Sequence, residues 1–216
     1  MSVWDDRLEA YRTSATHAND PDLDTVVALC EPRAGLRALD VATGGGHVAR
    51  RLREAGVDVV TTDAAAGMQP DIVAPAEQLP FEDGAFDVVV TRIAPHHFSD
   101  IRGAVGEMAR VTRAAVIVED TLFTSDAVEE AEKLRDPSHH RNYSEAEWRS
   151  FLEGAGLSVE HVEEFRKTHT LDDWLARTGC AGETAERVRE LLAPVTSADG
   201  TTWQDTKIIL KAKKKV

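Results

Sequence analysis

The sequence has few cysteines and no long apolar run, which argues against a cysteine-based metal or redox site and against a membrane-spanning helix. Cys30 and Cys180 are the only cysteines in 216 residues, and their separation matches no metal or redox spacing. One disulfide is compatible with this count, but two buried or free thiols in a reducing cytoplasm fit it better. No apolar stretch approaches the roughly 20 residues that a membrane-spanning helix needs, and the first residues lack the regions of a signal peptide. We therefore expect a cytoplasmic protein without a membrane partner.

Positive charge is also scarce. The 25 lysines and arginines are outnumbered by 38 acidic residues, which gives a net charge of −13. Broad nucleic-acid binding relies on basic side chains that neutralise phosphates, so we expect no nucleic-acid partner. The lysine-rich stretch 207–215 is short and is more typical of a solubilising tail on an edge strand. With 42% hydrophobic and 29% charged residues, the composition is that of a single globular domain over residues 1–216.

The chain is organised around residues 38–50, which predict a strand, a tight turn and a helix start. An apolar run contains Asp40, and the glycines Gly44, Gly45 and Gly46 follow it. Glycine is needed where the backbone takes a positive φ or comes close to a ligand, and the following helix offers unpaired N–H groups. The spacing Gly44-x-Gly46-x-x-Ala49 satisfies the dinucleotide fingerprint. An NAD(P)-dependent oxidoreductase is therefore one interpretation of this turn.

Asp40 favours a different ligand. A carboxylate beside the turn would repel a pyrophosphate but attract a cationic sulfonium group. The pattern acid-x-x-x-Gly-x-Gly resembles the first motif of the class I S-adenosylmethionine (SAM) methyltransferases. Ala42 stands where that family usually has its first glycine, and a small residue still permits close approach.

Apolar periodicity and turn residues predict alternating strands and helices. We expect helices over 3–18, 21–30, 46–54, 101–111, 125–134, 144–152, 171–178 and 183–192, and strands over 37–41, 57–63, 71–73, 86–91, 114–119, 157–165 and 202–213. This alternation is typical of an α/β fold with a doubly wound, seven-stranded, mostly parallel sheet whose last strand is antiparallel. Residues 1–33 would form an N-terminal helical lid, and residues 121–195 would supply partly helical insertions on the substrate side.

The connection between the second and third strands is unusually short. Only residues 64–70 separate Asp63 from the strand expected at 71–73. A parallel crossover normally needs a dozen or more residues. The sequence therefore predicts a shortened crossover, a truncated third strand and a less covered sheet edge, at which a homodimer could form.

Five motifs occur together in order. They are Asp40–Gly46, Asp63 with Met68 five residues on, Ala76–Phe81, Phe86–Val90 and His96-His97-Phe98. This set resembles the ubiquinone/menaquinone-biosynthesis type of class I SAM methyltransferases, which have a Rossmann-like fold, most closely over residues 36–120. The resemblance implies methyl transfer from SAM to a small-molecule acceptor by O-, C- or N-methylation. A non-catalytic SAM-binding protein is the alternative that keeps the same fold.

The resemblance also implies which residues bind the cofactor. Asp40 and the glycines would hold the methionine end and the ribose, Asp63 would accept from both ribose hydroxyls, and Met68 would pack on the adenine. The whole set implied for the cofactor is Asp40, Ala42, Gly44, Gly45, Gly46, Asp63, Ala64, Met68, Ala76, Glu77, Arg92 and Ile93, with Ala76 and Glu77 at the adenine edge and Arg92 and Ile93 under the methionine portion. Pro75 replaces the acid that often precedes the Ala-Glu pair.

His96 and His97 follow a strand at its carboxyl end, where α/β proteins form ligand sites. A neutral imidazole there can take a proton from a hydroxyl, enol or amine as the methyl arrives, or it can simply bond a loop carbonyl. The resemblance implies that His97 faces the methyl group, and both histidines are our catalytic candidates. The candidates for the substrate side are Tyr11, His17, His97, Asp120, His139 and Arg141.

The polar loop that contains Asp136, His139 and His140 raises the question of a metal site. Its spacing offers no helical i, i+4 pair of ligands. A substrate anion or a structural loop network is the better interpretation, and we expect no metal.

Overall fold

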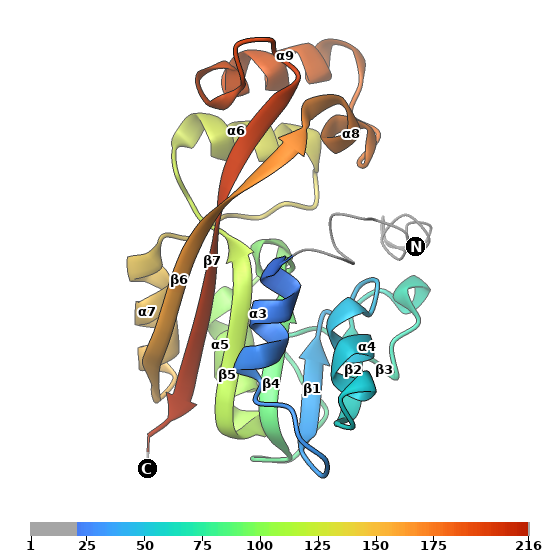
Figure 1. Cartoon of the computed structure of the whole chain (residues 1–216), viewed down its shortest axis with the longest axis vertical. Helices are drawn as coiled ribbons and strands as arrows, with labels where there is room; N and C mark the ends of the chain where they lie inside the picture. The colour runs from blue at the N-terminus through green and yellow to red at the C-terminus, as the bar shows by residue number, and fades with distance from the viewer. Residues whose placement is uncertain (1–20, 216) are drawn as a thin grey trace.

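The computed structural model describes residues 21–215, which form a seven-stranded sheet with helices on both faces (Figure 1). The strands are β1 (Arg37–Val41), β2 (Asp58–Asp63), β3 (Ile72–Val73), β4 (Phe86–Arg92), β5 (Thr112–Thr121), β6 (Leu157–Thr170) and β7 (Thr202–Lys214). Their order is β3-β2-β1-β4-β5-β7-β6. The order reverses between β1 and β4, which is the point where open α/β sheets bind ligands.

The predicted fold class is confirmed. Strands β1 to β5 pair in parallel, and β7 runs antiparallel to both of its neighbours, β5 and β6. The central strands are continuous apolar runs such as 88–90 because both faces of the sheet are covered. The shortened crossover is confirmed as well: the 3₁₀ turn η1 (Ala66–Met68) replaces a helix, and β3 has two residues, of which Val73 is 55% exposed. The homodimer at this edge stays a prediction.

Two helical layers cover the sheet. On one face lie α3 (Pro21–Leu29) and α4 (His47–Glu54), and on the other lie α5 (Ile101–Val111) and α7 (Glu145–Gly154). Successive strand residues point to opposite faces, so Ala38 joins the core cluster of Leu23 and Val48, while Leu39 joins the cluster of Met108 and Trp148. A capping box between Ser144 and Glu147 begins α7.

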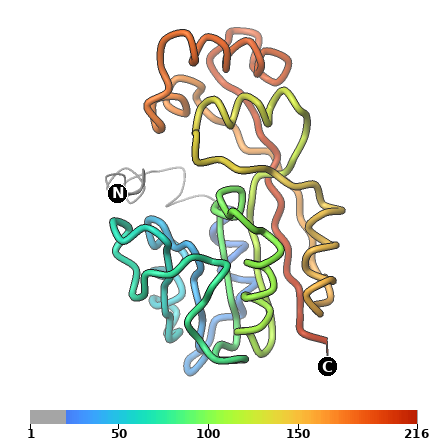
Figure 2. Tube along the Cα trace, turned by 180° about the vertical axis from the view of Figure 1, so that it is seen from behind, coloured from blue at the N-terminus to red at the C-terminus, as the bar shows by residue number. Residues whose placement is uncertain are grey.

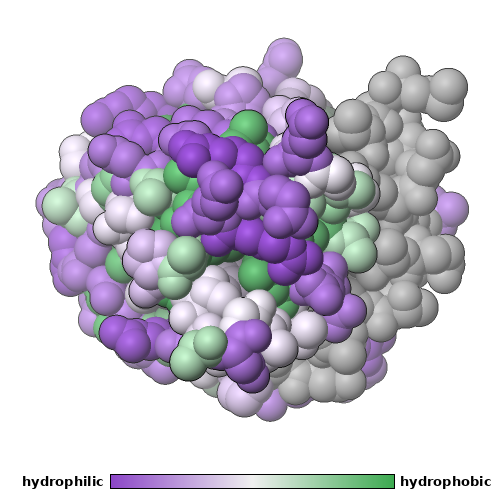
Figure 3. Space-filling model, turned by 90° about the horizontal axis from the view of Figure 1, so that it is seen from above, coloured by the Kyte–Doolittle hydropathy of each residue, from purple (hydrophilic) through white to green (hydrophobic). Residues whose placement is uncertain are grey.

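A third group of helices stands beyond the carboxyl ends of the parallel strands. We call α6 (Asp126–Arg135), α8 (Leu171–Ala176), α9 (Gly182–Leu192) and the 3₁₀ turn η3 (Ala193–Val195) the cap. The cap has its own core around Trp174 and Trp203. Strands β6 and β7 extend past the rest of the sheet to reach it (Figures 1 and 2). Seen from the cap end, the surface is mostly hydrophilic, and apolar side chains appear in small separate areas (Figure 3).

Several predicted boundaries are off by one or two residues, and the end of β6 is wrong by more. Strand β6 continues to Thr170 instead of ending at Phe165. Its outer part is polar and resembles a loop in the sequence, but it pairs with β7 as far as Thr170 opposite Thr202. Pairing with β7 holds this polar segment in the strand conformation, which the local sequence does not predict.

The predicted lid is described only in part. The helix expected over 3–18, with Tyr11 and His17, lies outside the described residues. Its neighbour α3 packs on the sheet through Leu23 and Val26, which are fully buried. Within residues 21–215 no helix is long and apolar enough to cross a membrane. Cys30 and Cys180 are both free thiols, as expected.

Candidate functional site

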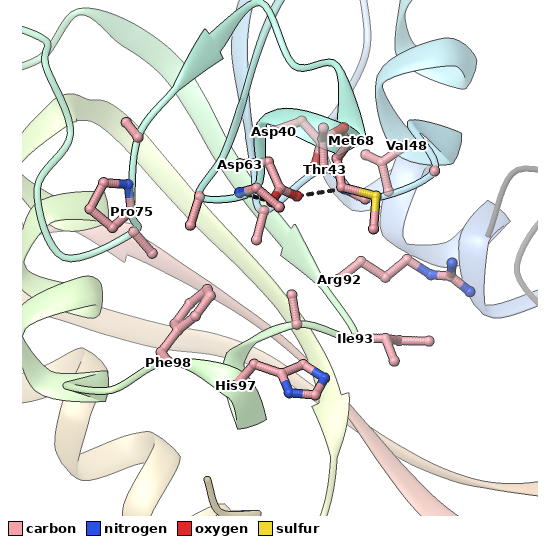
Figure 4. Close-up of a pocket in the computed structure, with 18 of the residues that line it drawn as sticks. Asp40, Thr43, Val48, Asp63, Met68, Pro75, Arg92, Ile93, His97 and Phe98 are labelled. Atoms are coloured by element: carbon pink, nitrogen blue, oxygen red, sulfur yellow. Dashed lines mark hydrogen bonds between the residues drawn. The ribbon is translucent and has the colours of Figure 1, made fainter. Parts of the chain in front are cut away.

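Two cavities lie side by side at the carboxyl ends of the parallel strands. The larger one, cavity A, has a volume of about 310 Å³. Its lining residues are Asp40, Ala42, Thr43, Gly44, Gly45, His47, Val48, Asp63, Ala64, Ala65, Met68, Ala74, Pro75, Ala76, Glu77, Arg92, Ile93, Ala94, His97, Phe98 and Ser99. Figure 4 shows the glycine turn with Asp63 and Met68 on one wall and Ile93, His97 and Phe98 on the opposite wall. All of the residues predicted for the cofactor line this cavity except Gly46, which ends the same turn.

The glycine turn is fixed by its backbone conformation. Gly44 and Gly46 have φ of 51° and 74°, in the left-handed region that favours glycine. A Cβ at either position would meet no atom within 4 Å, so φ and not crowding within the protein requires glycine there. Ala42 also has a positive φ, 54°. Glycine would adopt this φ without strain, which explains why the family usually has glycine at the position that Ala42 occupies here.

Asp40 accepts two hydrogen bonds that stabilise the glycine turn and the start of α4. Its Oδ2 accepts hydrogen bonds from Thr43 Oγ1 at 2.7 Å and from the Ala49 backbone N–H at 3.2 Å. The residue is only 2% exposed, and burial raises its pKa to about 6. Asp40 therefore connects the strand end, the turn and the first turn of α4 while it borders cavity A.

Asp63 joins the end of β2 to the glycine turn. Its Oδ2 accepts from the Gly44 N–H at 3.0 Å and its Oδ1 accepts from the Ala65 N–H at 2.9 Å. Burial raises its pKa, and the backbone bonds oppose that shift. A carboxylate has about four acceptor positions, so each oxygen keeps capacity for one more donor from cavity A.

Glu77 lines cavity A but also has a structural role. Its Oε1 accepts from Ser99 N–H at 2.8 Å, from Ser99 Oγ at 2.9 Å and from Asp100 N–H at 3.2 Å. Glu77 therefore fixes the loop that enters α5. Beside it, Met68 and Ala76 are buried and supply apolar wall.

Arg92 and Ile93 leave β4 at the switch point of the sheet. The Arg92 guanidinium donates to Asp22 of α3 and, at 2.6 Å, to Glu119 of β5, and its side chain is 5% exposed. The positive charge of Arg92 is therefore paired with two acidic side chains of the fold, although the residue also lines cavity A. Ile93 has φ of 51°, which is rare for a β-branched residue. Such strain is concentrated at functional sites, and Ile93 lies between the two cavities.

His97, in the 3₁₀ turn η2 (Pro95–His97), has one ring nitrogen fixed by the backbone. Its Nδ1 is 3.0 Å from the Ser138 carbonyl oxygen. A carbonyl only accepts, so Nδ1 carries the proton and Nε2 keeps a lone pair in the neutral ring. Burial, together with the neighbouring His96, lowers the pKa of His97. The ring is therefore an uncharged proton acceptor at neutral pH.

His96 contacts a buried acid and lines the neighbouring cavity described below. Its Nδ1 is 2.5 Å from Oδ1 of Asp120, which is fully buried. Burial lowers the pKa of His96 and raises that of Asp120 to about 7, so it favours the uncharged form of both groups. The ring centroids of His96 and His97 are 4.1 Å apart. His96 therefore supports the position of His97 from behind.

Cavity B is smaller, about 70 Å³, and lies between the sheet and the cap. It is lined by Ile93, His96, His97, Thr121, Glu132, Arg135, Asp136, His139, Lys167, His169, Trp174, Arg177, Asp205 and Lys207. Most of these side chains are polar or charged. Ile93 and His97 line both cavities, so a ligand in one would meet a ligand in the other at these two residues.

The candidates for the substrate side separate in the structure. His139 lines cavity B, but Asp120 lines neither cavity and acts through His96. Arg141 lies in a separate surface depression beside α7, with its side chain 51% exposed and its guanidinium 2.8 Å from Glu147. Tyr11 and His17 lie outside the described residues.

Sequence reasoning missed several lining residues. In cavity A these include Thr43 and Phe98, which lie within the quoted motifs, and His47 and Ser99, which adjoin them, so all four could have been included on that ground. The cap side of cavity B was missed almost entirely. Arg135, Lys167, Arg177 and Lys207 come from four separate segments, and no local pattern connects them.

The fold and cavity A together define a nucleotide-cofactor type of α/β protein, with a glycine turn after the first strand and an acid after the second. Comparison with known proteins specifies it further. Residues 39–118 match the family described as "Methyltransferase domain". The uncharacterized methyltransferase YcgJ of Bacillus subtilis is 29% identical over 212 residues, which cover 88% of this chain and 83% of that protein. Its crystal structure superposes with a TM-score of 0.83 at 26% identity, covering 90% and 98% of the two chains.

The similarity to quinone-pathway enzymes is confined to part of the chain. A demethylmenaquinone methyltransferase of Beutenbergia cavernae is 38% identical over 91 residues, which is 38% of this chain and 38% of that enzyme. A magnesium protoporphyrin IX methyltransferase from Synechocystis, solved with bound S-adenosylhomocysteine, shares the fold at 16% identity and a TM-score of 0.59. The comparisons thus confirm the resemblance in the sequence motifs and disfavour the oxidoreductase interpretation, since residues 39–118 match a methyltransferase domain and a relative that spans most of the chain is named a methyltransferase.

Proposed function

We propose that the protein transfers a methyl group from SAM, held in cavity A, to a small polar acceptor held in cavity B. The observation that carries this proposal is the contact between the cavities at Ile93 and His97. Methyl transfer is an in-line displacement that needs donor and acceptor aligned and water excluded. Two cavities that meet at one strained residue and one neutral imidazole suit this requirement.

The residues of cavity A fit the cofactor. The remaining lone pairs of Asp63 suit two ribose hydroxyls, because its two oxygens point into different parts of the turn. Met68 and Ala76 offer an apolar surface to an adenine ring, and the buried Asp40 beside the turn suits a cationic methionine end. Bound SAM supplies an electrophilic methyl group on a positively charged sulfur.

His97 is proposed as the general base. Its Nε2 would take the proton of an acceptor hydroxyl, enol or amine while the new bond to the methyl carbon forms. A neutral ring suits this task for a second reason: an imidazolium would be repelled by the sulfonium charge. The polar lining of cavity B would orient an acceptor that carries hydrogen-bonding groups.

Isothermal titration with S-adenosylhomocysteine, with NAD and NADP as controls, tests the assignment of cavity A. We expect micromolar binding of S-adenosylhomocysteine alone. Asp63→Ala should weaken it by about 1.5–3 kcal/mol, the contribution of hydrogen bonds to a charged group. Asp71→Ala is the matched control, because Asp71 lies at the same sheet edge, bonds Thr61 and Arg53, and does not line cavity A. Preference for a nicotinamide nucleotide, or equal affinity in Asp63→Ala, would contradict the proposal.

A further inference from the structure

A group of metal-binding side chains lies at the base of the cap, apart from cavity A. Glu129 and Glu132 are three residues apart on α6 and therefore lie on one helix face. His139 and Asn142 come from the loop that follows α6. The side chains of Glu129, Glu132 and His139 are 11%, 9% and 3% exposed, and Asn142 is 1% exposed. Two acids in such a buried position need a compensating positive charge.

The imidazole of His139 lies between the two carboxylates. Its Nε2 is 3.4 Å from Glu129 Oε1 and its Nδ1 is 3.6 Å from Glu132 Oε2. Asn142 holds both acids, since its backbone N–H donates to Glu129 Oε2 at 3.1 Å and its side-chain amide donates to Glu132. Asn142 therefore fixes both carboxylates in position through one oxygen of each.

Two buried atoms in this group, His139 Nε2 and Asn142 Oδ1, have no hydrogen-bond partner among the described residues. Buried polar atoms are nearly always satisfied, so two in one cluster require an explanation. Lys133 Nζ lies 3.1 Å from Glu129 Oε1 in an ion pair on the exposed side, but it does not serve His139 or Asn142.

We propose that Glu129, Glu132 and His139 bind one divalent metal ion such as Mn²⁺ or Zn²⁺, with Asn142 Oδ1 as a further ligand. One donor atom from each of the first three residues lies within 4.8 Å of the others. Carboxylate and amide oxygens with one imidazole nitrogen suit first-row divalent ions. Two carboxylates and a neutral imidazole carry a charge of about −2, which such an ion neutralises.

The site adjoins the proposed acceptor cavity. Glu132 and His139 line cavity B, and the His139 ring stacks on His96 with centroids 5.2 Å apart. A bound ion would fix the wall of cavity B and the loop that carries Ser138, whose carbonyl orients His97. The inference concerns ion binding and does not depend on the proposed acceptor or on methyl transfer.

The competing explanation without a metal is a doubly protonated His139 that bridges the two acids. The two explanations are separated by titrating chelator-treated full-length protein with Mn²⁺, followed by electron paramagnetic resonance of the free ion, and with Zn²⁺ by calorimetry. We expect one site per chain for at least one ion. Glu129→Gln and His139→Gln should each weaken binding at least tenfold while circular dichroism stays unchanged.

Glu130→Gln is the matched control, because Glu130 is on the same helix, is 52% exposed and pairs with Arg187. It should bind the ion as the wild type does. The proposal is overturned if neither ion binds with a stoichiometry of one, or if all three variants bind equally. It is also overturned if ¹⁵N NMR of the metal-free protein shows a His139 imidazolium at neutral pH that persists when either ion is added.

Discussion

His97 is the residue at which the two cavities meet, and its ring is held in a single tautomer by Ser138. If Nε2 accepts the acceptor's proton, His97→Ala removes the base and leaves the cofactor contacts intact. We expect turnover to fall by about 10²–10⁴-fold, the usual contribution of general-base catalysis, with little change in affinity for S-adenosylhomocysteine. Steady-state kinetics and calorimetry measure the two effects, and Arg141→Ala, which lines neither cavity, is the control.

The pH dependence of the same residue has a defined sign. Burial lowers the pKa of His97 below the usual 6.5, so the ring remains neutral as the pH falls through that value. Proton-accepting capacity is present above the lowered pKa and is lost only below it. We therefore expect protonation of His97 to cause no loss of turnover between about pH 8 and 6. A loss of activity centred near pH 6.5 that disappears in His97→Ala would show that the ring is exposed to solvent during catalysis.

Ala42 illustrates strain at the residue scale. Its φ of 54° costs an L-residue about 1–2 kcal/mol relative to the right-handed region, and glycine avoids this cost. Glycine loses more chain entropy on folding, so we expect Ala42→Gly to raise the free energy of unfolding by about 1 kcal/mol, measured by urea denaturation. Ala38→Gly, in the preceding strand β1 at an ordinary φ and fully buried, should lower it. A loss of stability in Ala42→Gly would mean that the methyl group of Ala42 contributes more packing than strain.

The cofactor side of the site could be predicted from local sequence, because its residues lie at or near the carboxyl ends of predicted strands. Asp40, Asp63 and His97 are examples, and the sheet brings such strand ends to one edge. Arg92 shows the limit. Its place in the site was predictable, but its pairing with Asp22, 70 residues away, depends on how α3 packs on the sheet. The group for which we propose metal binding was not recognised in the sequence, since Glu129 and Glu132 precede the loop in which ligands were sought.

At the scale of elements, the parallel strands were predictable and the cap was not. Buried strands such as β4 are apolar runs with clear turn signals, whereas the outer part of β6 is polar and takes its conformation from β7. The helices of the cap were recognisable by periodicity, but nothing in their spacing places α6 beside α9. Their packing is set by the tryptophans that β7 and α8 bring together.

Trp203 anchors the cap. It is fully buried, and its ring centroid lies 4.6 Å from that of Trp174. Removing a buried Trp side chain typically costs about 3–5 kcal/mol, so Trp203→Ala should lower the denaturation midpoint markedly. Trp174 lines cavity B and not cavity A, so the folded variant should keep its S-adenosylhomocysteine affinity and lose turnover. Val195→Ala, at an exposed position in η3, should change neither. A parallel loss of cofactor affinity in Trp203→Ala would show that the cap and cavity A are energetically coupled.

At the scale of the whole molecule, cavity A connects segments that are far apart in the chain. The turn after β1, the end of β2, the 74–77 segment and the loop after β4 all contribute lining residues. A ligand that contacts all four binds the folded state and not the unfolded chain, so it stabilises the protein by mass action. At a ligand concentration of 100 times the dissociation constant, the free energy of unfolding rises by about 2.7 kcal/mol. For a chain of this size that corresponds to a rise in melting temperature of about 5–11 °C.

Thermal unfolding with saturating S-adenosylhomocysteine measures this gain, and hydrogen exchange locates it. We expect increased protection at residues 40–49, 63–68, 74–77 and 92–99, the four chain segments that would close on one ligand, and little change in α9, which lines neither cavity. The same concentration of adenosine should give a smaller rise, because it lacks the methionine portion that would lie beside Asp40 and Ile93. If adenosine stabilises the protein as strongly as S-adenosylhomocysteine does, the methionine end of the proposed site is wrong and Asp40 serves only to hold the glycine turn.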